Sequence, residues 1–209
     1  MEQEIILVDE KDRPVGCCSK ERAHREGLLH RAFSVFIIDK NGRMLIQKRA
    51  KEKYHSGGLW ANGCCSHPRK GEALGTAVER RLFEELGIKV PKGAYGKKDC
   101  RIPCEWFSFI YRHEFSPQLF EYELDHVFLM RYDESLHGPL RPDPREIQEL
   151  WWLEMKKLSF LLKTRPGAFA CWFELAAPRV LSMIGNGRPL GYGKRREGRR
   201  EGRRTYAGV

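Results

Sequence analysis

The stretch LWANGCCSHPRKGEALGTAVERRLFEELGI, residues 59–88, joins a loop with two adjacent cysteines to a helical pattern. Leu74, Val78 and Leu82 recur at every fourth position and therefore form one apolar stripe along a helix. Gly87 follows the stripe and belongs to the residue type that most readily ends a helix. The stretch predicts an amphipathic helix preceded by a polar, glycine-containing loop.

Charged and reactive side chains surround this helix. Glu84 and Glu85 occupy its last turn, where the helix dipole disfavours acids, and such a conflict indicates a functional use. In the preceding loop Cys65 lies two residues from His67 and near several cations, a setting that favours the thiolate. The alternative for Cys65 is the commonest role of a free cysteine, a small buried side chain.

Strand patterns occur on both sides of the helix. Asn41-Gly42 suits a tight turn between residues 33–39 and 43–49, the clearest predicted hairpin. Residues 49–71 form a long predicted loop, a kind of segment that is often functional. Further strands are predicted at 5–9, 15–19, 104–115, 120–133 and 146–155, and helices at 156–164 and 167–184. This order predicts an α/β or α+β sandwich with a mixed β-sheet.

The 209-residue chain is long enough for one well-filled core and a small appendage. Its formal net charge is +10, of which residues 185–209 contribute +6, from eight Lys/Arg minus two Glu. Their GKRREGRREGRR repeat is typical of a disordered segment. We predict one domain over residues 1–184 and a basic tail over 185–209, which is either solvated or a contact for RNA or acidic surfaces.

Composition also bears on location. No apolar run approaches the roughly 18 residues of a membrane span, and the first residues do not resemble a secretory signal. We therefore expect a cytoplasmic protein without membrane association. The chain has seven cysteines, an odd number, and no CxxC motif, which predicts reduced thiols and no disulfide framework.

Two carboxylates are expected on one face of a strand. Because side chains alternate along a strand, Glu121 and Glu123 share a face, with Cα atoms roughly 7 Å apart. They could bind a divalent cation or transfer protons, and the alternative is a solvent-facing stripe. His24, His30 and His67, in or beside predicted loops, could complete a ligand set for Mn²⁺, Zn²⁺ or Mg²⁺. Taken singly, a histidine is more often packed or exposed.

Basic residues from separate segments form another candidate group. Such residues converge when a protein holds a phosphate or diphosphate, and their alternative role is ordinary surface charge. The candidates are Lys20, Arg49, Lys53 and Arg81.

Together these residues resemble the type I isopentenyl diphosphate isomerases, relatives of the Nudix hydrolases. The resemblance spans about residues 4–183 and rests on HRAFSVFIID (30–39), LWANGCCSHP (59–68), RRLFEELGI (80–88) and EYELDHVF (121–128), in the family's order and spacing. It implies a Nudix-like sandwich of a mixed sheet and flanking helices. It also implies a 1,3-shift of a double bond, which interconverts isopentenyl and dimethylallyl diphosphate.

Two departures from the Nudix pattern G-x5-E-x7-R-E-U-x-E-E-x-G-U, where U is apolar, are shared with the isomerases. Ser66 replaces the first glycine, and Arg81 replaces a glutamate that helps a hydrolase bind Mg²⁺. The resemblance therefore argues against pyrophosphate hydrolysis, and Arg81 could hold substrate phosphate instead.

The resemblance implies a Mn²⁺ or Zn²⁺ site of three histidines and two glutamates, at His24, His30, His67, Glu121 and Glu123. It implies a Mg²⁺ ion next to the substrate diphosphate on Glu85, with diphosphate contacts at Lys20, Arg49, Lys53 and Arg81. Cys65 and Glu123 would transfer protons on opposite faces of the substrate. Tyr111 would hydrogen-bond Glu123, Trp172 would stabilise a carbocation, and no flavin would take part.

Two rival interpretations remain open at this point. One is a Nudix hydrolase of a nucleotide diphosphate, and the other is an RNA-binding module that acts through the tail. The favoured interpretation predicts a small diphosphate as partner, nucleic acid only through the tail, and a monomer or weak homodimer.

Overall fold

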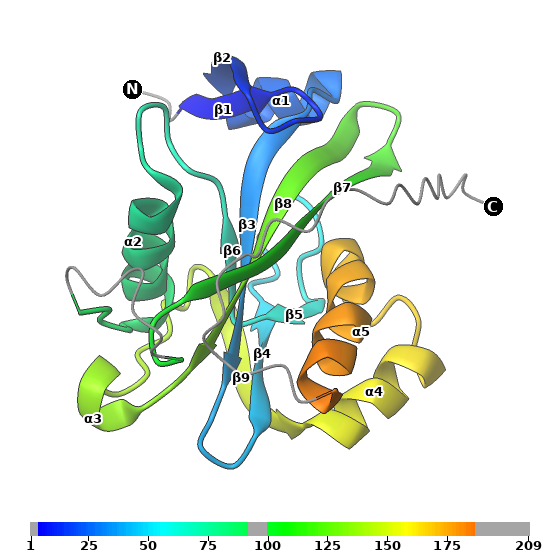
Figure 1. The fold of residues 1–209 in the computed structure, drawn as a ribbon. Coiled ribbons are helices and arrows are strands. Elements are labelled where there is room, and N and C mark those ends of the chain that lie inside the picture. The colour runs from blue at the N-terminus through cyan, green and yellow to red at the C-terminus, as the bar shows by residue number, and fades with distance from the viewer. Residues whose placement is uncertain (1–3, 92–99, 187–209) are drawn as a thin grey trace.

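A computed structural model describes residues 4–91 and 100–186. One mixed sheet crosses the molecule (Figure 1) and is built from β1 (Glu4–Val8), β2 (Pro14–Ser19), β3 (His30–Ile38), β4 (Arg43–Arg49), β5 (Trp60–Asn62), β6 (Cys64–Ser66), β7 (Cys104–Ser116), β8 (Leu119–Arg131) and β9 (Ile147–Glu154). The helices are α1 (Lys20–Glu26), α2 (Leu74–Leu86), α3 (Glu134–His137), α4 (Met155–Thr164) and α5 (Cys171–Gly185).

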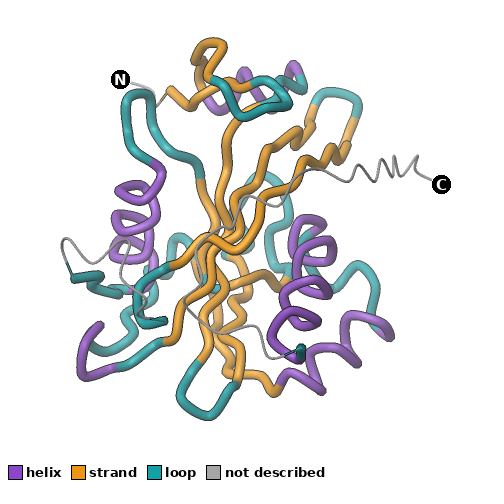
Figure 2. The backbone as a smooth tube through the Cα atoms, viewed as in Figure 1, coloured by secondary structure: helices purple, strands orange, loops and turns teal. Residues whose placement is uncertain are grey.

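Helices cover both faces of the sheet, with strands crossing the middle of the backbone trace (Figure 2). Along β3, Val35 belongs to a core shared with Val78 of α2, whereas Phe36 stacks on Phe173 of α5 with ring centroids 5.7 Å apart. Adjacent residues of β3 thus serve two cores, as alternation along a strand dictates. The predicted α+β sandwich with a mixed sheet is confirmed.

Strand β3 is the centre from which the rest of the sheet is arranged. It pairs in parallel with β8, where His30 lies opposite Glu123, and antiparallel with β6, where Ser34 lies opposite Cys65. The long β7–β8 hairpin places Tyr111 opposite Glu123. Residues about ninety positions apart in the sequence are therefore brought together on adjacent strands.

The first two strands lie at one edge of the sheet, and with the first helix they form the group at the top of Figure 1 that we call the N-terminal cap (residues 4–27). It has a small apolar cluster of Ile5, Cys18 and Ala23. Ser19 caps α1 by accepting a hydrogen bond from the backbone N–H of Arg22. The cap carries α1 over the end of β8.

The predicted hairpin at residues 33–49 is confirmed, with Gly42 at the positive φ of 75° that its turn requires. The prediction of an unstructured loop over residues 49–71 is wrong in part, because β5 and β6 lie within it. Each has only three residues, too few for an alternating pattern. Helix α1 was not predicted, since its KERAHRE sequence has one apolar residue.

The domain boundaries stay a prediction. Helix α5 extends to Gly185, and the remainder of the predicted tail, residues 187–209, lies outside the described residues. Within the described ranges, no helix combines the length and the apolar character needed to cross a membrane. All seven cysteines are free thiols, as expected.

Candidate active site

Four potential metal donors from four elements meet at one end of β3. His24 comes from α1, His30 begins β3, His67 follows β6, and Glu123 lies on β8. Their ligand atoms all lie within 4.8 Å of one another. Three imidazoles and a carboxylate suit Mn²⁺ or Zn²⁺.

Buried nitrogens of these imidazoles lack protein hydrogen-bond partners. His30 donates from Nδ1 to the Leu28 carbonyl oxygen at 2.8 Å, which leaves its Nε2 without a hydrogen bond. His24 Nδ1 lies 2.6 Å from Tyr54 Oη, and its buried Nε2 also has no partner. Fixing one ring nitrogen by a hydrogen bond is the usual arrangement of a metal-binding histidine. The residues present therefore fit a metal ion.

Burial also favours the neutral imidazoles that metal binding needs. It lowers the pKa of His24, with the charges of His67 and Lys20 adding to the effect. Burial and Lys20 lower the pKa of His67 to about 4. His24 and His67 are consequently neutral near pH 7 and can offer lone pairs.

Glu121 and Glu123 are only 3% and 6% exposed, so the alternative of a solvent-facing stripe is wrong. Glu123 Oε1 lies 2.9 Å from His67 Nε2, but Glu121 is outside the group of four donors. Glu121 lies instead 3.3 Å from His55 Nε2 and accepts a hydrogen bond from Cys171 Sγ at 3.5 Å. The structure thus gathers four of the five expected ligands and sets the fifth beside them.

The two glutamates have different charge states. Burial, followed by the charge of Glu123, raises the pKa of Glu121 to about 8. Burial would also raise the pKa of Glu123, but the ring nitrogens of His30 and His67 beside its carboxylate outweigh that effect and lower the pKa. Glu121 therefore holds a proton near pH 7, whereas Glu123 is a carboxylate.

Cys65 lies on the opposite edge of β3 from Glu123, since β6 pairs with one side of β3 and β8 with the other. Arg49 Nη1 lies 3.7 Å from its sulfur. The expectation of a thiolate is wrong for this state of the protein. Burial raises the pKa of Cys65 to about 12 because desolvation outweighs the attraction of Arg49.

The four predicted phosphate contacts converge. Lys20, Arg49, Lys53 and Arg81 line a cavity of about 230 Å³, together with Cys65 and Glu123. This volume suits a small ligand. The basic residues are therefore a cluster around one cavity and not scattered surface charge.

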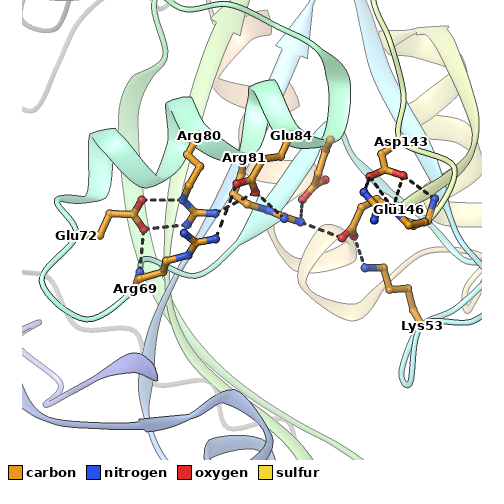
Figure 3. Close-up of polar contacts among 10 residues, drawn as sticks. Lys53, Arg69, Glu72, Arg80, Arg81, Glu84, Asp143 and Glu146 are labelled. Carbon is orange, nitrogen blue, oxygen red and sulfur yellow. Dashed lines mark hydrogen bonds and ion pairs between the residues drawn. The ribbon is translucent and has the colours of Figure 1, made fainter. Parts of the chain in front are cut away.

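Acidic partners hold two of these cations (Figure 3). Glu146 pairs with Lys53 and lies 3.3 Å from Arg81, which also pairs with Glu85. Burial raises the pKa of Glu85 and Arg81 opposes that effect. Glu85, the expected Mg²⁺ ligand, lies on α2 and is not one of the four gathered donors.

The ion pair between Glu72 and Arg80 has a structural role. Glu72 accepts hydrogen bonds from Arg80 Nε at 2.7 Å and Nη2 at 2.8 Å, and one from the backbone N–H of Arg69 at 2.9 Å (Figure 3). These bonds tie the loop after β6 to α2. They fix the segment that carries His67.

Trp172 closes one side of the cavity and is 4% exposed. Its Nε1 donates a hydrogen bond to Asn62 Oδ1 at 3.0 Å, and the Arg49 guanidinium lies 5.0 Å from its ring centroid. A cation already occupies the neighbourhood of this ring, which fits the cation-stabilising role expected for it.

Four residues with clear parts in this geometry were not among the predicted site residues: Tyr54, His55, Asn62 and Glu146. Tyr54 and His55 directly follow Lys53 in the polar segment 49–71, and this proximity was the available signal. Glu146 could not be found from the sequence, because it reaches the site only through the β4–β9 pairing.

Comparison with known proteins agrees with this geometry. The NUDIX domain family matches residues 28–173. The isopentenyl-diphosphate Delta-isomerase of Burkholderia multivorans is 44% identical over 86% of this chain and 94% of its own length. The protein of that name from Streptomyces coelicolor is 37% identical over 87% of each chain.

Solved structures show the same fold at low identity. DR0079 from Deinococcus radiodurans aligns with a TM-score of 0.61 at 21% identity, over 85% of this chain and 98% of its own. The MutT protein from Methanosarcina mazei Go1 aligns with a TM-score of 0.55 at 15% identity, over 75% of this chain and 95% of its own. With its NUDIX domain and its close relatives, the chain belongs to the isopentenyl-diphosphate Delta-isomerase family.

Proposed function

We propose that the protein interconverts isopentenyl and dimethylallyl diphosphate by protonation and deprotonation. One observation carries this proposal: Cys65 and Glu123 flank β3 in a single cavity that also contains four cationic side chains. The names of the relatives support the same substrate class.

The diphosphate would bind at the cationic side of the cavity. Lys20, Arg49, Lys53 and Arg81 supply the charge, and Arg81 and Lys53 would exchange part of their pairing with Glu146 for phosphate oxygens. Glu85 would hold Mg²⁺ next to the diphosphate. Loss of the hydrolase glutamate at position 81 removes a ligand that hydrolysis needs.

A metal ion, Mn²⁺ or Zn²⁺, would be held by His24, His30, His67 and Glu123, and Glu121 would supply the fifth ligand. When bound, it supplies positive charge that orients Glu123 and tunes its acidity. No flavin is required for this chemistry.

The chain's own residues would move the protons. In the isopentenyl-to-dimethylallyl direction, Glu123 with Tyr111 delivers a proton to the terminal methylene carbon, which leaves a tertiary carbocation. Cys65, as the thiolate, then removes a proton from the CH₂ carbon next to the cationic carbon, on the opposite face, and the double bond forms between these two carbons. The other direction exchanges the two roles.

In the resting state Cys65 is a neutral thiol and Glu123 a carboxylate, which suits the dimethylallyl-to-isopentenyl direction. The isopentenyl-to-dimethylallyl direction requires Cys65 to be deprotonated and the transferable proton to lie on the Glu121, Tyr111 and Glu123 group, which is joined by the Tyr111 hydroxyl. Trp172 would face the carbocation, and a desolvated cation–π contact contributes about 2 kcal/mol. Burial of the site limits competing attack by water.

Further properties belong to the same proposal. We expect a cytoplasmic monomer or weak homodimer, with nucleic acid contacted, if at all, through the tail. Nucleotide-diphosphate hydrolysis is the rival activity, and the shared NUDIX fold is the observation in its favour.

Proton NMR of the purified protein with isopentenyl diphosphate in D₂O would test the proposal, with Mg²⁺ and either Mn²⁺ or Zn²⁺ present. Growth of dimethylallyl methyl signals with deuterium incorporation is expected. Phosphate release with an unchanged carbon skeleton would instead support the hydrolase. An unchanged substrate, with metals bound and thiols reduced, would refute the isomerase activity.

A further inference from the structure

A partly buried ion-pair network lies on the face of the sheet opposite the candidate site. Asp12, in the turn between β1 and β2, lies at a φ of 63°. Its Oδ1 accepts a hydrogen bond from Arg31 Nε at 2.7 Å, and Arg31 Nη2 donates to the Asp12 carbonyl oxygen at 2.7 Å. Its Oδ2 lies 3.2 Å from His126 Nε2. One aspartate of the N-terminal cap therefore contacts an arginine and a histidine of the sheet.

His126 is fixed on its other side as well. Its Nδ1 lies 3.0 Å from Glu105 Oε1 on β7, and the residue is 4% exposed. Burial would lower the pKa of His126, but Asp12 and Glu105 outweigh it and raise that pKa. The two ring nitrogens face different carboxylates. His126 therefore links β7 to the N-terminal cap, and the carboxylates do not converge on one point as the ligands of a metal ion would.

The alternation of β8 separates this network from the catalytic groups. Glu121 and Glu123 share one face, and His126, three residues beyond Glu123, points to the other. Arg31 likewise follows His30 on β3 and faces away from it. The N-terminal cap consequently reaches both faces: its turn contacts the far one, and α1 lies by the near one.

Other contacts also join the cap to the rest of the molecule: Ile5 forms a β-bridge with Arg69, and Glu4 pairs with Lys70. The β1–β3 pairing consists of Leu7 opposite His30, and Ile6 and Val8 share a small apolar cluster with Leu124. The cap contributes His24 to the metal-donor group. A misplacement of about 1 Å in such a supporting element is enough to impair a site.

We propose that Asp12 positions α1. Its contacts with Arg31 and His126 fix the N-terminal cap against the sheet, so that His24 reaches the metal-donor group; we call this contact the latch. This inference rests on the proposed function only for the role of His24. Asp12 touches no reacting group, so its role is positioning. Its carboxylate is paired on site with Arg31 and His126, which gives the turn one preferred docking position.

Isothermal titration of the metal-free protein with Zn²⁺ alone tests the latch. Asp12→Asn keeps the shape but removes the charge, and its Zn²⁺ affinity should fall about tenfold, at the lower end of the cost of altered outer-shell partners. The neighbouring exposed Glu10→Gln is the matched control and should leave the affinity unchanged. His126→Gln should weaken binding in the same direction, and the double variant should not be weaker than Asp12→Asn alone.

Hydrogen exchange separates a local effect from general loosening. In Asp12→Asn, amides of residues 20–26 should exchange faster while those of residues 74–86 keep their wild-type rates. Equal acceleration in both helices, or unchanged Zn²⁺ affinity, would overturn the latch. The proposed function fails separately, if the wild-type protein does not isomerise the substrate with Mg²⁺ and either Mn²⁺ or Zn²⁺ present.

Discussion

Tyr111 lies directly opposite Glu123 in the β7–β8 ladder and donates a hydrogen bond from Oη to Glu123 Oε2 at 2.7 Å. The same hydroxyl oxygen is 3.1 Å from Glu121 Oε2. Burial, together with both carboxylates, raises the pKa of Tyr111, so the phenol stays protonated. Tyr111 is thus a donor shared between two carboxylates that differ in charge.

Tyr111→Phe removes this shared donor and should lower kcat while leaving KM nearly unchanged. A hydrogen bond to a charged group contributes about 1.5–3 kcal/mol, which corresponds to roughly a tenfold to hundredfold loss. Steady-state kinetics of isomerisation would measure it. A change confined to KM would contradict a role in proton delivery.

Cys65→Ser should reduce kcat by about 10²- to 10⁴-fold, the usual contribution of a positioned acid or base. The hydroxyl is similar in size but a much poorer proton-transfer group than the thiol. Cys17→Ser, at a half-buried cysteine of β2, is the control and should retain full turnover. Near-normal turnover of both Cys65→Ser and Glu123→Gln would remove these residues from the mechanism.

Asn62→Ala should destabilise the fold as well as the site. Asn62 is fully buried, accepts from Trp172 Nε1 at 3.0 Å and donates to the Cys64 carbonyl oxygen at 2.6 Å. Loss of the Asn62 side chain leaves the Trp172 indole N–H without an acceptor, which lowers the free energy of unfolding by about 1–3 kcal/mol. Urea unfolding would give this value. Asn62→Asp keeps the acceptor, and should restore the Trp172 contact but not the donated bond.

His126→Gln should change how stability depends on pH. Asp12 and Glu105 raise the pKa of His126 above its ordinary 6.5 against the effect of burial; Arg31 pairs with Asp12, and Asp125 is the remaining acid nearby. Because the folded-state pKa is raised, the stabilisation is complete below pH 6.5 and is lost as the pH rises through the raised value.

The free energy of unfolding of His126→Gln should therefore differ most from wild type below pH 6.5, and the difference should shrink above it. Denaturant unfolding at several pH values would measure this dependence. His113→Gln, at an exposed position of β7, is the matched control. A difference that is constant with pH would mean that His126 acts through packing alone.

Metal removal should lower thermal stability, because the donors come from α1, β3, β8 and the loop after β6. An ion present at 100 times its Kd stabilises the folded state by about 2.7 kcal/mol. Calorimetry before and after chelation would detect the change in Tm. In His30→Gln the same chelation should have a smaller effect, and an equal effect would place the ion elsewhere.

The sequence predicted most of the sheet and the long helix, because their apolar periods extend over several residues. Leu74, Val78 and Leu82 mark α2, and Val78 and Leu82 are indeed fully buried. Short elements escaped, since β5 and β6 have three residues each and no period to detect. The convergence of the site residues came from resemblance to a family, since spacing alone left each of them with an ordinary alternative.

Charge states could not be predicted from the sequence at all. Cys65 was expected as a thiolate because cations surround it in the chain, yet desolvation decides the outcome. Glu121 and Glu123 have identical side chains two residues apart, but His67 and His30 approach only Glu123. Such asymmetry depends on the three-dimensional positions of groups from distant segments.

The adjacent cysteines of β6 provide two built-in reporters. Cys64 is fully buried in the core with α2, whereas Cys65 lines the cavity. A thiol reagent would modify Cys64 only when the sheet opens globally, and would modify Cys65 through the empty cavity, slowly because the raised pKa keeps the thiol protonated. Alkylation followed by peptide mass mapping could therefore read, from one tryptic peptide, both the folding equilibrium and ligand occupancy. The two thiols therefore report on global opening of the sheet and on emptying of the cavity, which differ greatly in free energy.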